Sequence, residues 1–127
     1  MAYQRKLSNE PRCPFEHAMQ LFSGKWKARV LCLLNSLGTM RFHEISREMG
    51  GISDGVLTGA LQDLLASGMV SRAVYGEVPP RVEYALTEKG RSFIPVLRAI
   101  CIWAQTDRTF APEDMLSPCR QCENLQQ

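Results

Sequence analysis

The apolar residues in the first half of the chain recur at helical spacing. They predict a helix over 14–22, a second helix over about 25–37, a short helix over 42–49 and a fourth helix that begins near Ser53. Gly50-Gly51 separates the last two of these as a tight turn. A short helix, a glycine turn and an amphipathic helix are typical of a helix-turn-helix.

After Gly68 the period changes from helix to strand. Alternating residues over 70–75 and over 81–86 flank a proline-bearing loop, 76–80, and this pattern predicts a β-hairpin. Thr87 then provides an N-cap for a final helix over about 88–108. The tail, 111–127, has turn residues and no hydrophobic period.

This order of elements predicts a mainly α fold with a small β-hairpin, which is a winged helix-turn-helix. The second helix of such a motif fits the DNA major groove, and the hairpin reaches the neighbouring backbone or minor groove. We expect a flexible arm over 1–12, the winged domain with its dimerisation helices over 13–109, and a flexible tail containing cysteines over 110–127.

Composition narrows the class of protein further. The chain has 127 residues, which suits one domain, and a net charge of only +2, so any DNA-binding footprint must be local. The polar segment 1–12 lacks the apolar core of a signal peptide, and the longest apolar run, 30–34, is far shorter than a membrane span. These features predict a cytoplasmic protein without a membrane partner, and its five cysteines are expected to be reduced thiols.

Short motifs along the chain resemble the HxlR-type transcription regulators, which are winged-helix relatives of the MarR group in bacteria. The motifs are Cys13-Pro14, Gly24-Lys25-Trp26-Lys27, Arg41-Phe42, Gly51-Ile52-Ser53, Leu57-Thr58, Glu77-Val78-Pro79-Pro80-Arg81-Val82-Glu83-Tyr84, Leu86-Thr87-Glu88 and Gly90. The resemblance implies a homodimer on double-stranded DNA, with the helix from Ser53 in the major groove and the loop from Pro79 to Arg81 as the wing. It also implies dimerisation through the first and last helices and, as in some members, sensing of oxidants or electrophiles at Cys13.

The candidate DNA contacts are polar or basic residues of the recognition helix, the wing and the helix starts: Ser53, Thr58, Gln62, Arg81, Lys25, Arg41 and Arg47. Each has a simpler interpretation. Ser53 can be only a cap, Thr58 only a surface residue, and the basic side chains an ordinary solvated surface. Arg81 can be a cross-strand partner of Glu83 or Glu77 instead of a minor-groove contact.

The recognition helix departs from the family's pattern, because the expected exposed face holds Asp54, Gly55, Gly59, Gln62 and Asp63. Aspartates repel phosphate unless they face away or accept a hydrogen bond from cytosine, and two glycines weaken a helix. This departure leaves open a winged domain that binds protein instead of DNA.

The final helix is apolar on two faces, and a helix of this kind must bury both. One face can cover the winged domain and the other then needs a partner, so we expect a homodimer. The candidate interface residues are Phe15, Met19, Leu97, Ile100 and Trp103. Pro95 is expected to kink this helix or to mark a local break.

The cysteines allow three interpretations. Cys13 precedes a helix start and follows Arg12, and both features favour a reactive thiolate; the alternative is an inert, partly buried thiol. Cys119 and Cys122 form a CxxC that can be half of a zinc site completed by Cys13 and His17, a redox pair, or an accident. A metal-responsive regulator thus remains an alternative, but no catalytic constellation or phosphate loop stands out, so we expect neither an enzyme nor a cofactor.

Overall fold

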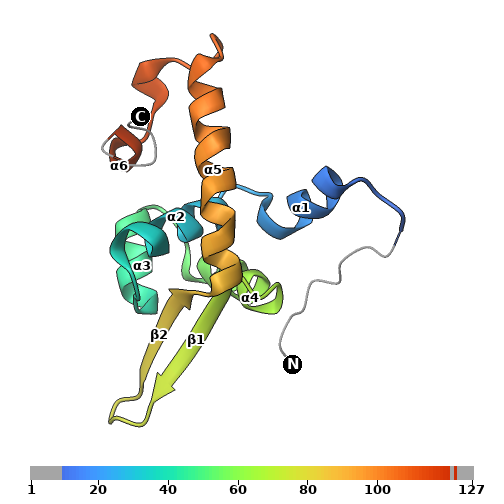
Figure 1. The fold of residues 1–127 in the computed structure, drawn as a ribbon. Helices are drawn as coiled ribbons and strands as arrows, with labels where there is room; N and C mark the ends of the chain where they lie inside the picture. Colours follow the sequence, from blue (N-terminus) through green and yellow to red (C-terminus); the bar gives the residue numbers. More distant parts are fainter. Residues whose placement is uncertain (1–9, 121, 123–127) are drawn as a thin grey trace. The chain divides into compact units, whose positions relative to one another are not determined.

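The computed structural model describes residues 10–120 and 122 (Figure 1). Contacts divide the chain into two compact units, one up to Arg91 and one from Ser92. The elements, in chain order, are α1 (Pro14–Phe22), α2 (Lys27–Leu37), α3 (Phe42–Met49), α4 (Asp54–Ala66), β1 (Val70–Tyr75), β2 (Arg81–Leu86), α5 (Glu88–Thr106), the 3-10 turn η1 (Pro112–Asp114) and α6 (Ser117–Arg120). The mainly helical winged fold is therefore confirmed. Most of the arm predicted over 1–12 lies outside the described residues.

The core of the first unit is built from the three helices of the helix-turn-helix region. Its fully or almost fully buried side chains include Val30, Leu31, Leu34, Ile45, Leu57, Leu61, Leu64 and Met69. Gly50 and Gly51 have φ angles of 59° and 71°, a left-handed conformation that glycine adopts without strain. This turn lets α3 end and α4 begin within four residues, as the sequence predicted.

The hairpin pairs β1 with β2 antiparallel, with Val70 opposite Leu86 and Tyr75 opposite Arg81. The backbone of Met40 adds to it, because its N–H donates to the Tyr84 carbonyl at 2.9 Å and its carbonyl accepts from the Tyr84 N–H at 2.7 Å. The segment before α3 is thus tied to the base of the wing.

The start of α5 is fastened to the residues just before β1. The Thr87 hydroxyl accepts from the Gly90 N–H at 3.0 Å, as expected of an N-cap, and donates to the Gly68 carbonyl. The Lys89 ammonium donates to the Ser67 carbonyl at 2.7 Å. A Cβ at Gly90 would collide with the Met69 carbonyl oxygen, so the close approach of the two segments requires glycine here.

Helix α5 continues through Pro95 to Thr106, close to the range 88–108 that the sequence predicted. Of the two expectations for Pro95, a local break is therefore not found, and a kink stays a prediction. The tail differs more from the sequence prediction. The tail contains η1 and α6, which the hydrophobic pattern did not predict, because a period cannot be recognised in three or four residues. Among the described helices none is long and apolar enough to cross a membrane.

Candidate nucleic-acid interface

Helix α4 has one buried face and one polar face. The Ser53 hydroxyl accepts from the Val56 N–H at 3.2 Å and fixes the start of the helix. With the helix anchored there and Leu57, Leu61 and Leu64 in the core, the positions at spacing four, Asp54, Thr58 and Gln62, fall on the other face. Thr58 is exposed and Gln62 is half-buried. The structure thus brings together the three recognition-helix candidates, Ser53, Thr58 and Gln62, on one helix.

Asp63 lies away from this face, and its charge is compensated. Its carboxylate is 3.3 Å from the Lys27 ammonium of α2, and the two side chains are only 15% and 8% exposed. The sequence had suggested that Asp63 lies on the exposed face of α4, and the position of Lys27 beside Trp26 gave no sign of the pair. This expectation was wrong, because a lysine between helices can bury its aliphatic stem and still keep its charge paired. Because Lys27 compensates its negative charge, Asp63 is not expected to repel phosphate as the sequence had suggested.

Gly55 and Gly59 lie one helical turn apart beside this polar face. Among the described residues, no atom beyond the helix backbone and the chain neighbours lies within 4 Å of the place where either Cβ would be. Neither glycine has a left-handed conformation. Packing within the chain therefore does not explain why α4 carries two residues that weaken helices.

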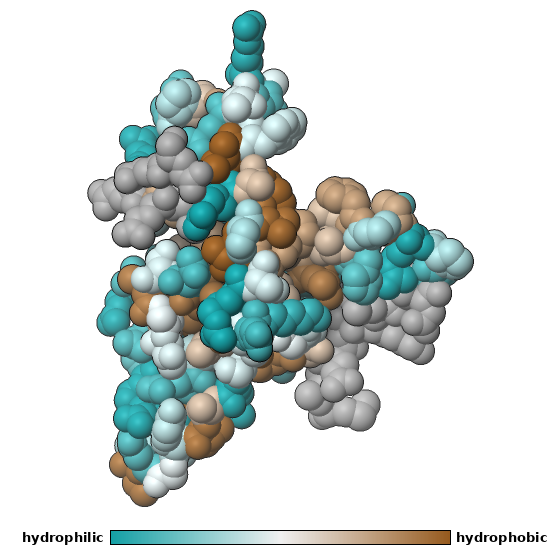
Figure 2. All heavy atoms as spheres, in the orientation of Figure 1, coloured by the Kyte–Doolittle hydropathy of each residue, from teal (hydrophilic) through white to brown (hydrophobic). Residues whose placement is uncertain are grey.

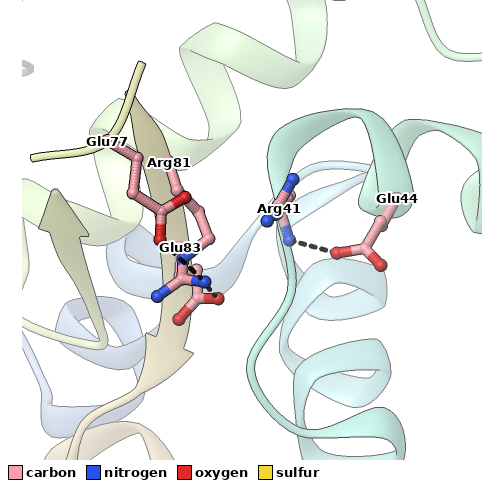
Figure 3. A network of polar contacts seen from close by, with 5 residues as sticks. All are labelled: Arg41, Glu44, Glu77, Arg81 and Glu83. Carbon is pink, nitrogen blue, oxygen red and sulfur yellow. Dashed lines mark hydrogen bonds and ion pairs between the residues drawn. The ribbon is translucent and has the colours of Figure 1, made fainter. Parts of the chain in front are cut away.

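Arg81, the candidate on the wing, is held by three side chains, of which Figure 3 shows Glu77 and Glu83 and the third is Tyr75. One guanidinium nitrogen is 3.2 Å from the Glu77 carboxylate and another is 3.5 Å from Glu83. The guanidinium also lies over the Tyr75 ring, 4.3 Å from its centroid. Both carboxylate pairings that the sequence offered as the simpler interpretation are thus present. The stacking on Tyr75 was missed, although these residues face each other in the hairpin register.

The remaining basic candidates are exposed in the first unit. Lys25 lies over the Trp26 ring at 4.7 Å, and Arg29 lies over the same ring at 5.1 Å. Arg41 precedes α3, where its backbone N–H donates to the Glu44 carboxylate at 2.8 Å (Figure 3). Arg47 is exposed in the last turn of α3. These residues provide a local positive charge. Because the net charge of the chain is only +2, a DNA-binding surface needs such a local concentration of basic side chains.

The dimer candidates differ in their exposure. Phe15 and Trp103 are each 67% exposed and Ile100 is 41% exposed, while Met19 is half-buried. Leu97 is only 5% exposed, so it offers little surface to a partner. Figure 2 shows apolar side chains reaching the surface along α5.

Cys13 is exposed at the N-cap position of α1. The guanidinium of the neighbouring Arg12 is directed elsewhere, because it donates to the Glu10 carbonyl at 2.9 Å and lies 2.7 Å from Nδ1 of His17. The exposure suits a reactive thiol, but the geometry shows no role for Arg12 in activating it.

The tail cysteines lie close to a third cysteine of the same unit. Burial and then the neighbouring Cys119 and Cys122 raise the pKa of Cys101. The region that the structure describes contains no group of three or more histidine, cysteine or carboxylate side chains arranged to hold a metal. The zinc site considered with Cys13 and His17 stays untested, because those two residues belong to the first unit and the tail cysteines to the second.

A family model described as HxlR-like helix-turn-helix matches residues 21–110. The chain belongs to this family. An uncharacterised HTH-type transcriptional regulator of Methanothermobacter thermautotrophicus is 50% identical to this HxlR-like chain over 97 residues, covering 76% of the chain and 73% of the relative. Another from Halalkalibacterium halodurans is 39% identical over 101 residues, covering 80% and 89%.

Solved structures agree with this assignment. The redox regulator HypR in its oxidised form is 38% identical to the HxlR-like chain, with a TM-score of 0.69 over 76% of this chain and 98% of HypR. The reduced form of the transcriptional regulator YodB from B. subtilis is 32% identical, with a TM-score of 0.69 over 77% and 96%. The chain is accordingly a transcription regulator with a winged helix-turn-helix fold, and these relatives are named as regulators and not as enzymes.

Proposed function

We propose that this HxlR-like protein is a homodimeric, sequence-specific regulator that binds double-stranded DNA in the cytoplasm. Helix α4 enters the major groove with Ser53, Thr58 and Gln62 toward the bases. The wing places Arg81 against the DNA backbone or in the minor groove. Lys25, Arg41 and Arg47 supply contacts to phosphates, which position the protein without reading sequence.

The observation that carries this proposal is the exposed polar face of α4. Leu57, Leu61 and Leu64 already fill the core face of α4, and no packing contact within the described residues requires glycine at the two positions beside the polar face. Glycine lets another molecule approach the helix backbone closely. The strip formed by Gly55 and Gly59 therefore favours the insertion of α4 into a DNA groove. The same strip would serve a protein partner, and a binding experiment with DNA separates the two.

The test is fluorescence anisotropy of the reduced protein on duplexes that flank its own coding region, at several salt concentrations. We expect one duplex to bind more tightly than random DNA, with log affinity falling steeply against log salt, because bound phosphates release counterions. Gln62→Ala should weaken binding to that duplex and reduce the ratio of its affinity to that of random DNA. Asn35→Ala removes an exposed amide from α2 and should change neither. Equal affinity for all duplexes, at every salt concentration, would contradict the proposal.

The homodimer is proposed from the apolar side chains that α1 and α5 leave exposed. Burying an aromatic residue in the centre of an interface contributes strongly to association. Trp103→Lys should therefore give a monomer in analytical ultracentrifugation and weaken DNA binding, since two half-sites would no longer be bound together. Val78→Lys, a control at a fully exposed position in the hairpin loop, should leave the dimer intact.

Thiol switching at Cys13 is proposed from its exposure and from the redox regulator HypR among the structural neighbours. Oxidants or electrophiles that modify Cys13 are expected to change the spacing of the two recognition helices and thereby the affinity for DNA. The DNA affinity of Cys13→Ser should be insensitive to mild oxidation, while Cys32→Ser should respond as the parent protein does. A parent protein whose affinity is unchanged after Cys13 has been modified would refute the switch.

A further inference from the structure

Three thiols lie in the second unit, in a region to which the proposed DNA contacts assign no role. Cys101 is on α5, Cys119 is in α6, and Cys122 follows two residues after that helix. All three are thiols and all three are half-buried. Each residue is thus partly accessible to solvent.

The backbone holds two of them at the spacing of a disulfide. The Cys122 N–H donates to the Cys119 carbonyl at 3.2 Å, a hydrogen bond between residues i and i+3. Such a bond closes a turn that keeps the two Cα atoms less than about 7 Å apart. A disulfide spans Cα separations of roughly 4.4–6.8 Å, so the pair can be joined without large movement of the chain.

Cys101 belongs to the same unit, and its pKa lies above the ordinary value of a thiol. Burial raises the pKa of Cys101, and negative charge on Cys119 and Cys122 raises it further. Because the thiolate and not the thiol is the nucleophile, the raised pKa makes Cys101 less reactive than an ordinary cysteine at neutral pH.

We propose that Cys119 and Cys122 form a reversible dithiol–disulfide site that is oxidised by hydroperoxides and is separate from Cys13. One thiolate of the pair attacks the peroxide oxygen, which gives a sulfenic acid and, after protonation, an alcohol or water. The other thiol attacks the sulfenic sulfur, the S–S bond forms and water leaves. Two thiols and one hydroperoxide thus become one disulfide, one alcohol and one water, and a second dithiol reverses the step by exchange.

A peptide map of the full chain tests this proposal directly. Trypsin cuts after Arg98, Arg108 and Arg120, so that Cys101, Cys119 and Cys122 fall in three different peptides. The protein is treated with hydrogen peroxide, remaining thiols are blocked with N-ethylmaleimide, and the digest is analysed without reduction. We expect peptide 109–120 linked to peptide 121–127, the link being lost after reduction, and a monomer band on a non-reducing gel.

Matched variants separate this site from the other thiols. Cys119→Ser and Cys122→Ser should each abolish the link, whereas Cys101→Ser and Cys13→Ser should keep it. A link of either tail cysteine to Cys101 or to Cys13, a linked dimer, or overoxidised thiols without a link would each overturn the proposal. The map does not depend on DNA, so a protein that fails the anisotropy test can still form the disulfide, and the two failures are distinguishable.

Discussion

Helix α4 and the wing each hold an ion pair between basic and acidic side chains, but the two arrangements differ in how far they are buried. On α4, Asp63 is paired with Lys27 in a setting that is almost closed to water. On the wing, Glu77 and Glu83 hold Arg81, and these side chains are 51%, 25% and 31% exposed.

The difference in burial predicts different roles for the two arrangements. A buried pair cannot be opened without leaving a charge in a poorly solvated place, so it belongs to the fold. Exposed pairs contribute about 0–1 kcal/mol each, and a phosphate can therefore replace the carboxylates around Arg81 at little cost. We expect α4 to be fixed before DNA arrives, and the wing arginine to change partners on binding.

Removing the buried cation should have the largest effect. Lys27→Met removes the cation of this buried pair and should lower the free energy of unfolding by about 3 kcal/mol. Urea denaturation measures this loss. The double variant Lys27→Met, Asp63→Leu should recover most of it, because two apolar residues leave no unpaired charge. A single variant as stable as the parent would mean that the pair is dispensable for the fold.

Arg81→Ala should act on binding more than on folding. If the guanidinium exchanges its carboxylates for one phosphate, the variant loses affinity for every duplex by about tenfold, and the salt slope becomes shallower by about 0.9. Anisotropy against salt gives both values. Arg108→Ala, which removes an exposed arginine from the second unit, is the control. An unchanged slope would show that Arg81 stays with Glu77 and Glu83 in the complex.

The glycines of α4 should show opposite effects on stability and on binding. Gly55→Ala and Gly59→Ala should each raise the free energy of unfolding by about 0.5–1 kcal/mol, since no atom outside the helix obstructs a Cβ. Both should weaken specific DNA binding, because the new methyl group stands where the groove must approach. Stability from urea melts and affinity from anisotropy can be measured on the same samples. A gain in both would exclude a close approach at this strip.

The smallest effect is expected at Glu77. Glu77→Gln removes one competitor for Arg81 and one negative charge near phosphate, so affinity should rise about two- to fivefold, corresponding to less than about 1 kcal/mol. Glu88→Gln, on the exposed first turn of α5, tests whether any lost acidic charge has this effect. A weaker complex of the Glu77 variant would show that the carboxylate positions Arg81 for DNA.

The parts of the fold that could be predicted depend on local chemistry. Three local features were found as expected: the Ser53 cap, the Gly50-Gly51 turn and the Thr87 cap. Each feature involves only residues that lie within three or four positions in the sequence. The hairpin followed from alternation and a proline loop. Local hydrogen bonding and backbone conformation leave a direct trace in the sequence.

The charge partners of the candidate site could be predicted only in part. Arg81 is close in sequence to both of its carboxylates, and these pairings were among the alternatives. Lys27 and Asp63 come from different helices, and nothing in the sequence of either helix indicates that the other residue is its partner. Likewise, the proximity of Cys101 to the CxxC pair depends on the path of a tail without hydrophobic period. Tertiary contacts of this kind require the structure.

The contact at Gly90 has a consequence for genetic screens of this protein. Any side chain at this position must displace the Met69 carbonyl or the first turn of α5, although Gly90 is not among the proposed contacts to bases. In a saturation mutagenesis library, substitutions at Gly90 should lower the abundance of the protein and thereby abolish regulation. Mutations in the regulated promoter would not suppress this defect. Such alleles would look like recognition mutants in a reporter assay, and an immunoblot would tell the two kinds apart.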